Sequence, residues 1–308
     1  MITSSFSLIR LRLGQLAAHL VVALIALVVI GGATRVMEAG LACPDWPLCY
    51  GSFLPGHQMN LQVFLEWFHR LDAFLVGIAL IIQFFIAIFW KEHLPKWLPW
   101  FYAFLVVLVV FQGGLGALTV LNLLPSAVVT AHLGLGLALI ALMSALTQKL
   151  LSSDGSQSPL WWKFMGLSSL FVVIFQSLLG GKMATAWASK KCLEQGQACE
   201  LLVLHRSTAS LAAMIIFIFV FTALFIGGWS RSQWPMLLSA SGLVIAQIAL
   251  GFFSVNFGLS MPLVTVFHQL FAALLVALLA ALSFRSPQSS NLNLNEMGDE
   301  ILLEPCNG

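Results

Sequence analysis

Charged side chains are scarce in this sequence. Asp, Glu, Lys and Arg make up 8% of the 308 residues, against about 25% in an ordinary soluble domain. Hydrophobic residues make up 60%, and the mean hydropathy is +0.97. This composition excludes a soluble globular fold and predicts an all-α integral membrane protein. The formal net charge of +2 gives no reason to expect a nucleic-acid partner, so the expected surroundings are the lipid bilayer.

Cysteine is also scarce, and none of the five cysteines forms a C-x-x-C pair. That spacing is typical of thiol redox proteins, so its absence argues against this class of activity. The cysteines instead fall in two wider pairs, Cys43 with Cys49 and Cys192 with Cys199, and a single Cys306 near the end of the chain.

Long apolar runs are what the sequence has in abundance. Eight runs of roughly 20 residues are each long enough to cross the hydrocarbon core as a helix. A polar segment, 152–162, separates four runs from four, and 286–308 is a polar stretch that predicts a disordered tail. We therefore expect two tandem, pseudo-symmetric four-helix bundles, 1–151 and 163–285. The predicted spans are 16–34, 66–90, 98–120, 127–148, 163–185, 202–228, 235–256 and 263–284.

The two halves repeat one pattern of histidines. His69 and His132 are 63 residues apart, as are His205 and His268, and the first histidine of each pair precedes an arginine. A Gly-Gly pair also stands 12 residues before the first outer cysteine in each half. Four spans in each half give both the same topology, so the halves are parallel repeats about an axis along the membrane normal. The first run has a counterpart in the second half and is expected to stay as a span rather than be cleaved as a signal peptide.

Lys and Arg residues near the helix ends predict the orientation. With the N-terminus inside, eight fall on the inner side and three to six on the outer side. We therefore expect a multi-pass protein of a bacterial cell membrane with both termini and the 152–162 linker in the cytoplasm. The cysteine loops then face an oxidising compartment, where Cys43–Cys49 and Cys192–Cys199 can close as structural disulfides. A redox role for the first pair stays open, and Cys306 in the inner tail is an incidental thiol.

The two histidine pairs are candidates for haem ligands. On this topology all four lie within about two turns of an outer helix end, at one depth. Two histidines on facing helices of a bundle can hold a haem iron from both sides, whereas zinc or copper would want further ligands that the sequence does not supply. The sequence predicts two bis-histidine haem sites, with purely structural histidines as the alternative. Arg70 and Arg206 are candidate propionate partners, unless they only reach to the interface.

Carboxylates distinguish the first pair from the second. Glu66 and Asp72 flank the first histidine at −3 and +3 on one helix face, where the second half has Leu202 and Thr208. A site that moves protons needs titratable groups, whereas electron transfer needs only ligands. We therefore expect the chemistry in the first half, with Glu66 as its catalytic residue, and a resident cofactor in the second. The alternative is that Glu66 sits in interfacial water and pairs with Arg70.

Taken together, these motifs resemble the haem A synthase family over about residues 10–285. They are more specific than any one short motif, because a cysteine-flanked loop occurs with four spaced histidines. The resemblance is carried by Gly31 to Arg35 (GGATR), 40–51 (GLACPDWPLCYG), Glu66-x-x-His69-Arg70, the stretch around His132, His205-Arg206 and His268.

Resemblance to this family implies an oxidation of the C8 methyl group of haem O, through hydroxylated intermediates, to the formyl group of haem A for terminal oxidases. His69 and His132 would hold the substrate haem O, and His205 and His268 would hold a permanent haem b. Glu66 would act as a general base or as a stabiliser of a cationic intermediate. The implied partners are haem O synthase, as a source of substrate, and an electron acceptor that the sequence does not identify.

Two other functions fit part of the pattern. A bis-histidine di-haem b cytochrome that exchanges electrons with quinone would use all four histidines, but it leaves the carboxylates beside the first pair unexplained. A thiol oxidoreductase that reduces quinone would use the outer cysteines, but it has no use for the histidines. The pigment of the purified protein separates these three functions.

Overall fold

The computed structural model describes residues 2–152, 157–185, 200–257 and 260–287. Eight helices within these ranges are long and apolar enough to cross a membrane, so the predicted all-α membrane fold with eight spans is confirmed. Their bounds are α1 Ile2–Val36, α2 Leu61–Phe89, α3 Leu98–Leu121, α4 Ser126–Leu151, α5 Leu160–Thr185, α7 Glu200–Ile226, α9 Trp234–Asn256 and α10 Pro262–Phe284. The short helices η1 (Lys91–His93) and α8 (Gly228–Ser232) lie in the connections.

Several helices begin earlier than the hydropathy predicts. The helix α2 begins at Leu61 rather than 66, because the Asn60 side chain accepts a hydrogen bond of 2.9 Å from the Val63 N–H and caps its first turn. Glu66 therefore lies in the second turn of α2. The helix α5 begins at Leu160, inside the predicted linker. Residues 153–156 of that linker, the tail from 288 onward and the cysteines 192, 199 and 306 lie outside the described residues.

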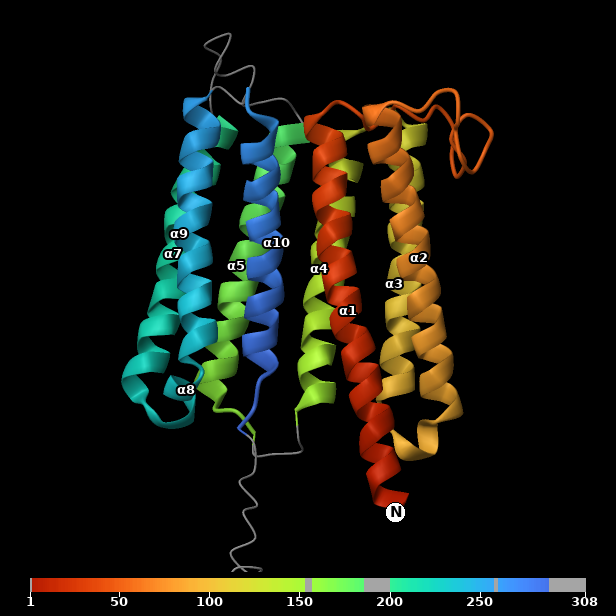
Figure 1. Ribbon diagram of the computed structural model, residues 1–308. Coiled ribbons are helices and arrows are strands. Elements are labelled where there is room, and N and C mark those ends of the chain that lie inside the picture. The colour runs from red at the N-terminus through yellow and green to blue at the C-terminus, as the bar shows by residue number, and fades with distance from the viewer. Residues whose placement is uncertain (1, 153–156, 186–199, 258–259, 288–308) are drawn as a thin grey trace, which may run out of the picture.

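The spanning helices pack in two rings (Figure 1). In the first ring α1 contacts α2, α2 contacts α3, α3 contacts α4 and α4 contacts α1. In the second ring the same order runs through α5, α7, α9 and α10. This packing is consistent with the predicted pair of tandem four-helix bundles.

The two rings meet along α1, α4, α5 and α10. The helix α10 contacts both α1 and α4, and α4 contacts α5. One polar link inside this junction is the Ser144 hydroxyl of α4, which donates to the Ala277 carbonyl of α10 at 2.7 Å. Such buried side chain–backbone hydrogen bonds commonly stabilise contacts between membrane helices, because helices in lipid have no hydrophobic driving force for association. The junction therefore holds α10 in a fixed position against the first half.

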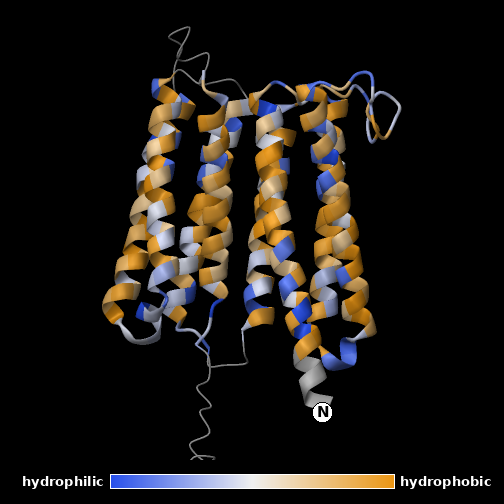
Figure 2. Cartoon of the chain, in the orientation of Figure 1, coloured by the Kyte–Doolittle hydropathy of each residue, from blue (hydrophilic) through white to orange (hydrophobic). Residues whose placement is uncertain are grey.

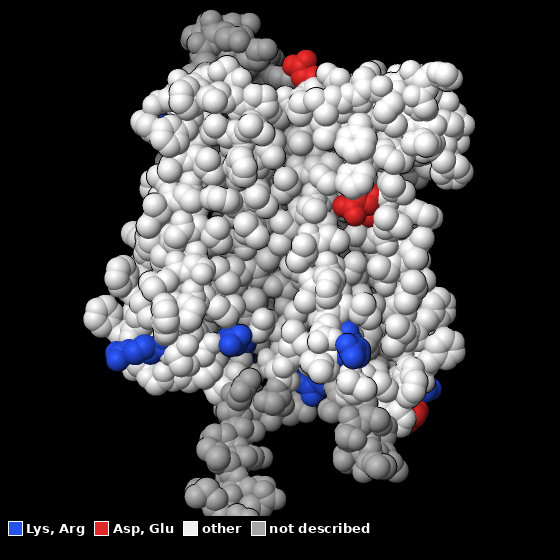
Figure 3. Space-filling model, viewed as in Figure 1, with Lys and Arg blue, Asp and Glu red and all other residues white. Residues whose placement is uncertain are grey.

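The surface is that of a multi-pass membrane protein. Apolar residues dominate the helices along most of their length (Figure 2). On the face shown in Figure 3, most Lys and Arg atoms gather near the lower end, which is the end of the N-terminus. The predicted cytoplasmic location of this end follows the positive-inside rule and stays a prediction.

Candidate functional site

All four repeated histidines lie near one end of the molecule. Their helices, α2, α4, α7 and α10, all begin at the upper end in Figure 1, and each histidine falls within about three turns of its helix start. The ring centroids of His69 and His132 are 6.5 Å apart. His268 lies close enough to His205 for an electrostatic interaction. The structure thus brings the histidines together in the two predicted pairs.

Each imidazole packs against a glycine of the neighbouring helix. An added methyl group would lie too close to the ring at Gly31, Gly180 and Gly116, so these glycines allow the close approach, whereas at Gly251 it would make an ordinary contact. The same contact recurs in both halves, although sequence analysis saw two of these glycines only as a repeat marker. A Cβ atom would lie 2.9 Å from His69 Cε1 if added to Gly31, 3.3 Å from His132 Cε1 if added to Gly116, 3.0 Å from His205 Cε1 if added to Gly180, and 3.4 Å from His268 Cε1 if added to Gly251.

Glutamines on adjacent helices hold the histidine backbones. Gln112 Nε2 donates to the His132 carbonyl at 3.0 Å, and its repeat counterpart Gln247 donates to the His268 carbonyl at 2.8 Å. These bonds tie α3 to α4 and α9 to α10 at the level of the histidines. They set the height of each ring relative to its partner helix.

The first histidine pair fits a haem iron between its two imidazoles. The Nδ1 atoms of His69, His132 and His268 are buried and have no hydrogen-bond partner, although an unsatisfied buried polar group costs about 1–3 kcal/mol. Two imidazoles on opposite sides of one metal ion have centroids about 6 Å apart, since a metal–imidazole bond is about 2 Å. The 6.5 Å separation of His69 and His132 is close to this value. Imidazole is also a common axial ligand of haem iron.

The second site contains a clamp. Gln176 Nε2 lies 3.0 Å from His205 Nδ1 and donates to the His205 carbonyl at 2.7 Å. The Thr208 hydroxyl donates to Gln176 Oε1 at 2.6 Å, which orients the amide. We call Gln176 and Thr208 the His205 clamp.

His69 of the first site has no such clamp, although Gln112 Nε2 lies 3.4 Å from His132 Nε2 in the same site. By the repeat, Leu27 occupies the place of Gln176, and Asp72 the place of Thr208. The Leu27 backbone carbonyl approaches the His69 ring, but a leucine side chain has no amide to donate, and His69 Nδ1 is without a hydrogen-bond partner. Asp72 is half-buried, and its side chain makes no hydrogen bond or ion pair within the described residues.

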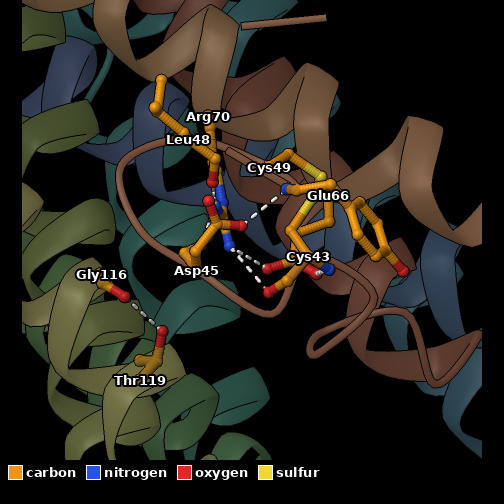
Figure 4. Close-up of polar contacts among 9 residues, drawn as sticks. Cys43, Asp45, Leu48, Cys49, Glu66, Arg70, Gly116 and Thr119 are labelled. Atoms are coloured by element: carbon orange, nitrogen blue, oxygen red, sulfur yellow. Dashed lines mark hydrogen bonds and ion pairs between the residues drawn. A yellow bond between two sulfur atoms is a disulfide. The ribbon is translucent and has the colours of Figure 1, made fainter. Parts of the chain in front are cut away.

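Glu66 joins α2 to the loop that contains the first cysteine pair (Figure 4). The residue is 4% exposed. Its Oε2 accepts a hydrogen bond of 2.8 Å from the Cys43 N–H, and its Oε1 pairs with the Arg70 guanidinium at 2.5 Å. The pairing with Arg70 matches the alternative interpretation from the sequence, but the carboxylate is buried rather than in interfacial water. The second half has Leu202 here and so has no charge at this position.

The Arg70 guanidinium organises the same loop. It donates to the carbonyls of Asp45 at 2.6 Å and Cys43 at 3.4 Å, and also to the Leu48 carbonyl. The predicted disulfide between Cys43 and Cys49 is confirmed, and both cysteines are buried. Propionate binding by Arg70 stays a prediction. The same holds for Arg206, whose side chain is exposed.

Asp45 stabilises the turn that follows the disulfide. Its carboxylate accepts hydrogen bonds from the Gly51 N–H at 2.8 Å and the Tyr50 N–H at 2.7 Å. The Gly51 bond is the main cause that holds the pKa of Asp45 below its ordinary value, with smaller contributions from the Tyr50 N–H and the Arg70 charge. The turn needs this support because Tyr50 has a positive φ of 53°, whereas Gly51 adopts its φ of 72° without steric cost.

A model of the COX15-CtaA family, described as cytochrome oxidase assembly protein, matches residues 15–280. The chain belongs to this family. Among its relatives is the heme A synthase of Shewanella oneidensis, 34% identical over 186 residues, which are 54% of each chain. The heme A synthase of Caulobacter sp. (strain K31) is 30% identical over 193 residues, 52% of this chain and 56% of that protein. The chain spans about half the length of the curated relatives it matches.

Within this COX15-CtaA member, sequence analysis found the four histidines, Glu66 and the first disulfide. It missed the contacts of Gly116 and Gly251 with the rings and the clamp around His205. The signal for the first two was present, because Gln112 and Gly116 recur at Gln247 and Gly251 with a constant spacing. The clamp gave no repeat signal, since neither of its residues is shared between the halves.

Proposed function

We propose that this family member is a haem A synthase, a membrane-bound oxidoreductase that converts the C8 methyl group of haem O to the formyl group of haem A. The relatives named heme A synthase support this function. The observation that carries the proposal is the asymmetry of the two histidine sites. Both share the glycine contacts, but Glu66 and Asp72 stand beside the first pair alone, so acid–base groups are available at one site.

The two sites take different roles in this proposal. His69 and His132 hold the substrate haem O, and His205 and His268 hold a resident haem b. A bound haem b supplies a one-electron redox centre. The His205 clamp favours retention at the second site, because Gln176 restrains the imidazole through both its ring and its backbone. A substrate must enter and leave, which suits the first site, where His69 has no such clamp.

Glu66 provides the negative charge of the first site. The Arg70 guanidinium and the Cys43 N–H both contact the carboxylate and fix its position. A fixed anion stabilises positive charge that develops on the substrate during oxidation, so we favour this role over that of general base. Arg70 and the Cys43–Cys49 loop hold the carboxylate in place and shield it from water.

The environment of the sites completes the proposal. The first half, 1–151, is catalytic, 163–285 holds haem b, and both termini, the linker 152–162 and the tail 286–308 are cytoplasmic in a bacterial cell membrane. The haem sites and cysteine loops then lie near the outer face, and Arg70 and Arg206 are available to propionates at that face. Haem O synthase delivers the substrate, and an acceptor in the membrane removes the electrons. Reporter fusions at the N-terminus and at the 37–60 loop test this orientation, and an outer N-terminus would contradict it.

Pigment analysis tests the function directly. The full chain is purified from cells with and without a supply of haem O, and the extracted haems are separated. We expect haem b in both preparations, and haem O with its oxidised products only in the first. Haem b as the sole pigment in both preparations would contradict the synthase and support the second candidate, a di-haem b cytochrome that exchanges electrons with quinone. The presence of a glycine against each of the four histidines is the observation that favours this candidate.

A further inference from the structure

Each Gly-Gly pair contacts two different parts of the molecule. Gly31 lies against His69 of its own half, whereas the next residue, Gly32, lies against Gln269 of the other half. A Cβ atom on Gly32 would be 1.6 Å from Gln269 Oε1, so the amide occupies the space that the glycine leaves. Gln269 directly follows His268 in α10. One turn of α1 therefore lies between His69 of the first site and Gln269, which is the neighbour of His268 in the second site.

The repeat places an apolar version of this contact at the second junction. Gly180 lies against His205 of its own half, and a Cβ atom on Gly181 would be 2.7 Å from Leu133 Cδ2 of the other half. Leu133 directly follows His132, as Gln269 follows His268. In both junctions, the residue after the second histidine reaches into the opposite half.

At the α10–α1 junction, the residue after the histidine also adds a hydrogen bond to this packing. Gln269 Nε2 donates to the Val28 carbonyl of α1 at 3.1 Å. A helix carbonyl has a second lone pair, so it can accept this bond in addition to its bond within the helix. The leucine at the other junction has no group that could do the same. The α4–α5 junction has a hydrogen bond of its own, between the Ser126 and Thr185 hydroxyls at 2.7 Å, but that bond does not involve the residue after the histidine. Among the described residues, a polar link through that residue runs only from the second site toward the first.

We propose that Gln269 is a positioning residue that couples the two histidine sites. Haem bound at the second site restrains His268 and the adjacent turn of α10. Gln269 passes this restraint to the Val28–Gly32 turn of α1, against which His69 packs. The first site is then held ready for its substrate when the second is filled. The inference rests on the proposed function only in that both sites bind haem.

The test measures the coupling as a ratio of affinities. Haem b is titrated into the first site of the full chain in detergent, once with the second site loaded and once with it emptied by His205→Ala. We expect tighter binding when the second site is loaded, by about two- to tenfold, the range for one neutral hydrogen bond. In Gln269→Met, which keeps the shape but cannot donate, we expect the ratio to fall to about one. The second site should keep its haem and its low-spin spectrum, which shows that the variant is folded.

Two further variants separate the polar link from packing in general. Gly32→Ala displaces the Gln269 amide and should also lower the ratio to about one. Gly181→Ala disturbs the apolar junction by the same added methyl group and should leave the ratio as in the parent chain. A parent ratio of one, or an unchanged ratio in Gln269→Met, would overturn the coupling. Because haem A formation is not measured here, a chain that couples its sites but never oxidises haem O would refute the proposed function and leave this inference standing.

Discussion

The two histidine sites are built on the same frame but hold their first histidine differently. His69 and His205 each lie against the first glycine of a Gly-Gly pair. His205 is also contacted by Gln176, which Thr208 orients, whereas Leu27 and Asp72 occupy these places beside His69. In the proposed function, this difference lets one duplicated arrangement of helices hold a resident cofactor in one half and an exchangeable substrate in the other.

The largest expected effect comes from removal of a second-site ligand. In His205→Ala or His268→Ala the purified protein should lose the bis-imidazole absorption of a low-spin haem b, because one axial ligand is missing. Absorption spectra of the reduced and oxidised protein measure this. His19→Ala, which changes a histidine outside the repeat, is the control and should retain the full spectrum. Full retention in both second-site variants would refute the assignment of the resident haem.

Removal of the charge at Glu66 should abolish the difference in chemistry between the sites. Glu66→Gln keeps the shape and can still accept the Cys43 N–H bond, so haem O should bind through His69 and His132. Haem A formation should fall by at least about 10²-fold, the usual lower range for a positioned acid–base or charged group. Extracted haems and haem O binding, measured on the same samples, separate turnover from affinity.

The matched control for Glu66 is the reverse change in the second half. Leu202→Glu introduces a carboxylate at the equivalent position and should create no second active site, since the resident haem b lacks the hydroxyethylfarnesyl group of haem O. Near-normal haem A formation in Glu66→Gln would show that the carboxylate is structural. Asp72 would then be the next candidate, because it is the other carboxylate beside His69.

Replacement of the clamp residues should make the second site release haem more readily, as expected for the first site. Gln176→Leu removes two contacts with His205, each worth about 0.5–1.5 kcal/mol, so haem b should dissociate about tenfold faster. The release of haem to an excess of apomyoglobin gives the rate. Thr208→Val, which only frees the amide to reorient, should have a smaller effect of the same sign. Equal release rates in all three proteins would mean that the clamp does not retain haem.

The second cysteine loop should match the first. We expect a Cys192–Cys199 disulfide beside the observed Cys43–Cys49 bridge, because both loops face the same oxidising side in the proposed orientation. Mass mapping of peptides under non-reducing conditions decides the pairing. A bridge between Cys43 and Cys192 or Cys199 would contradict it, and the Cys306→Ser variant excludes exchange with the tail thiol.

The smallest effect concerns acid loosening of the first loop. The pKa of Asp45 is below its ordinary value of about 3.9, so its stabilising contribution is present above this pH and is lost as the pH falls through the lower folded value. Hydrogen exchange at the Tyr50 and Gly51 amides should therefore rise below about pH 4. Asp45→Asn should make exchange at these amides independent of pH over this range after correction for the intrinsic rate. A persistent step in that variant would assign the titration to another group.

Much of the site is visible in the sequence because it repeats. Equal spacing singles out His69, His132, His205 and His268, and the change from Glu66 to a leucine in the second half marks the asymmetry. The contacts of Glu66 with the Cys43 N–H and Arg70 were only partly predictable. Arg70 lies one helical turn from Glu66, which a sequence shows, but the loop amide comes from another segment and reaches it only through the fold.

The sequence by itself determined the class of fold and the candidate residues for the chemistry. Apolar runs of sufficient length must become helices in a bilayer, because no other open structure there satisfies its backbone polar groups. The tertiary structure alone decided which ring faces which glycine, that Gln176 restrains His205, and that Gln269 links α10 to Val28 of α1. These contacts join helices far apart in the chain, and they depend on the relative height and rotation of packed helices. Hydropathy does not determine this relative height and rotation, because every apolar face of a helix is equally favourable in contact with lipid.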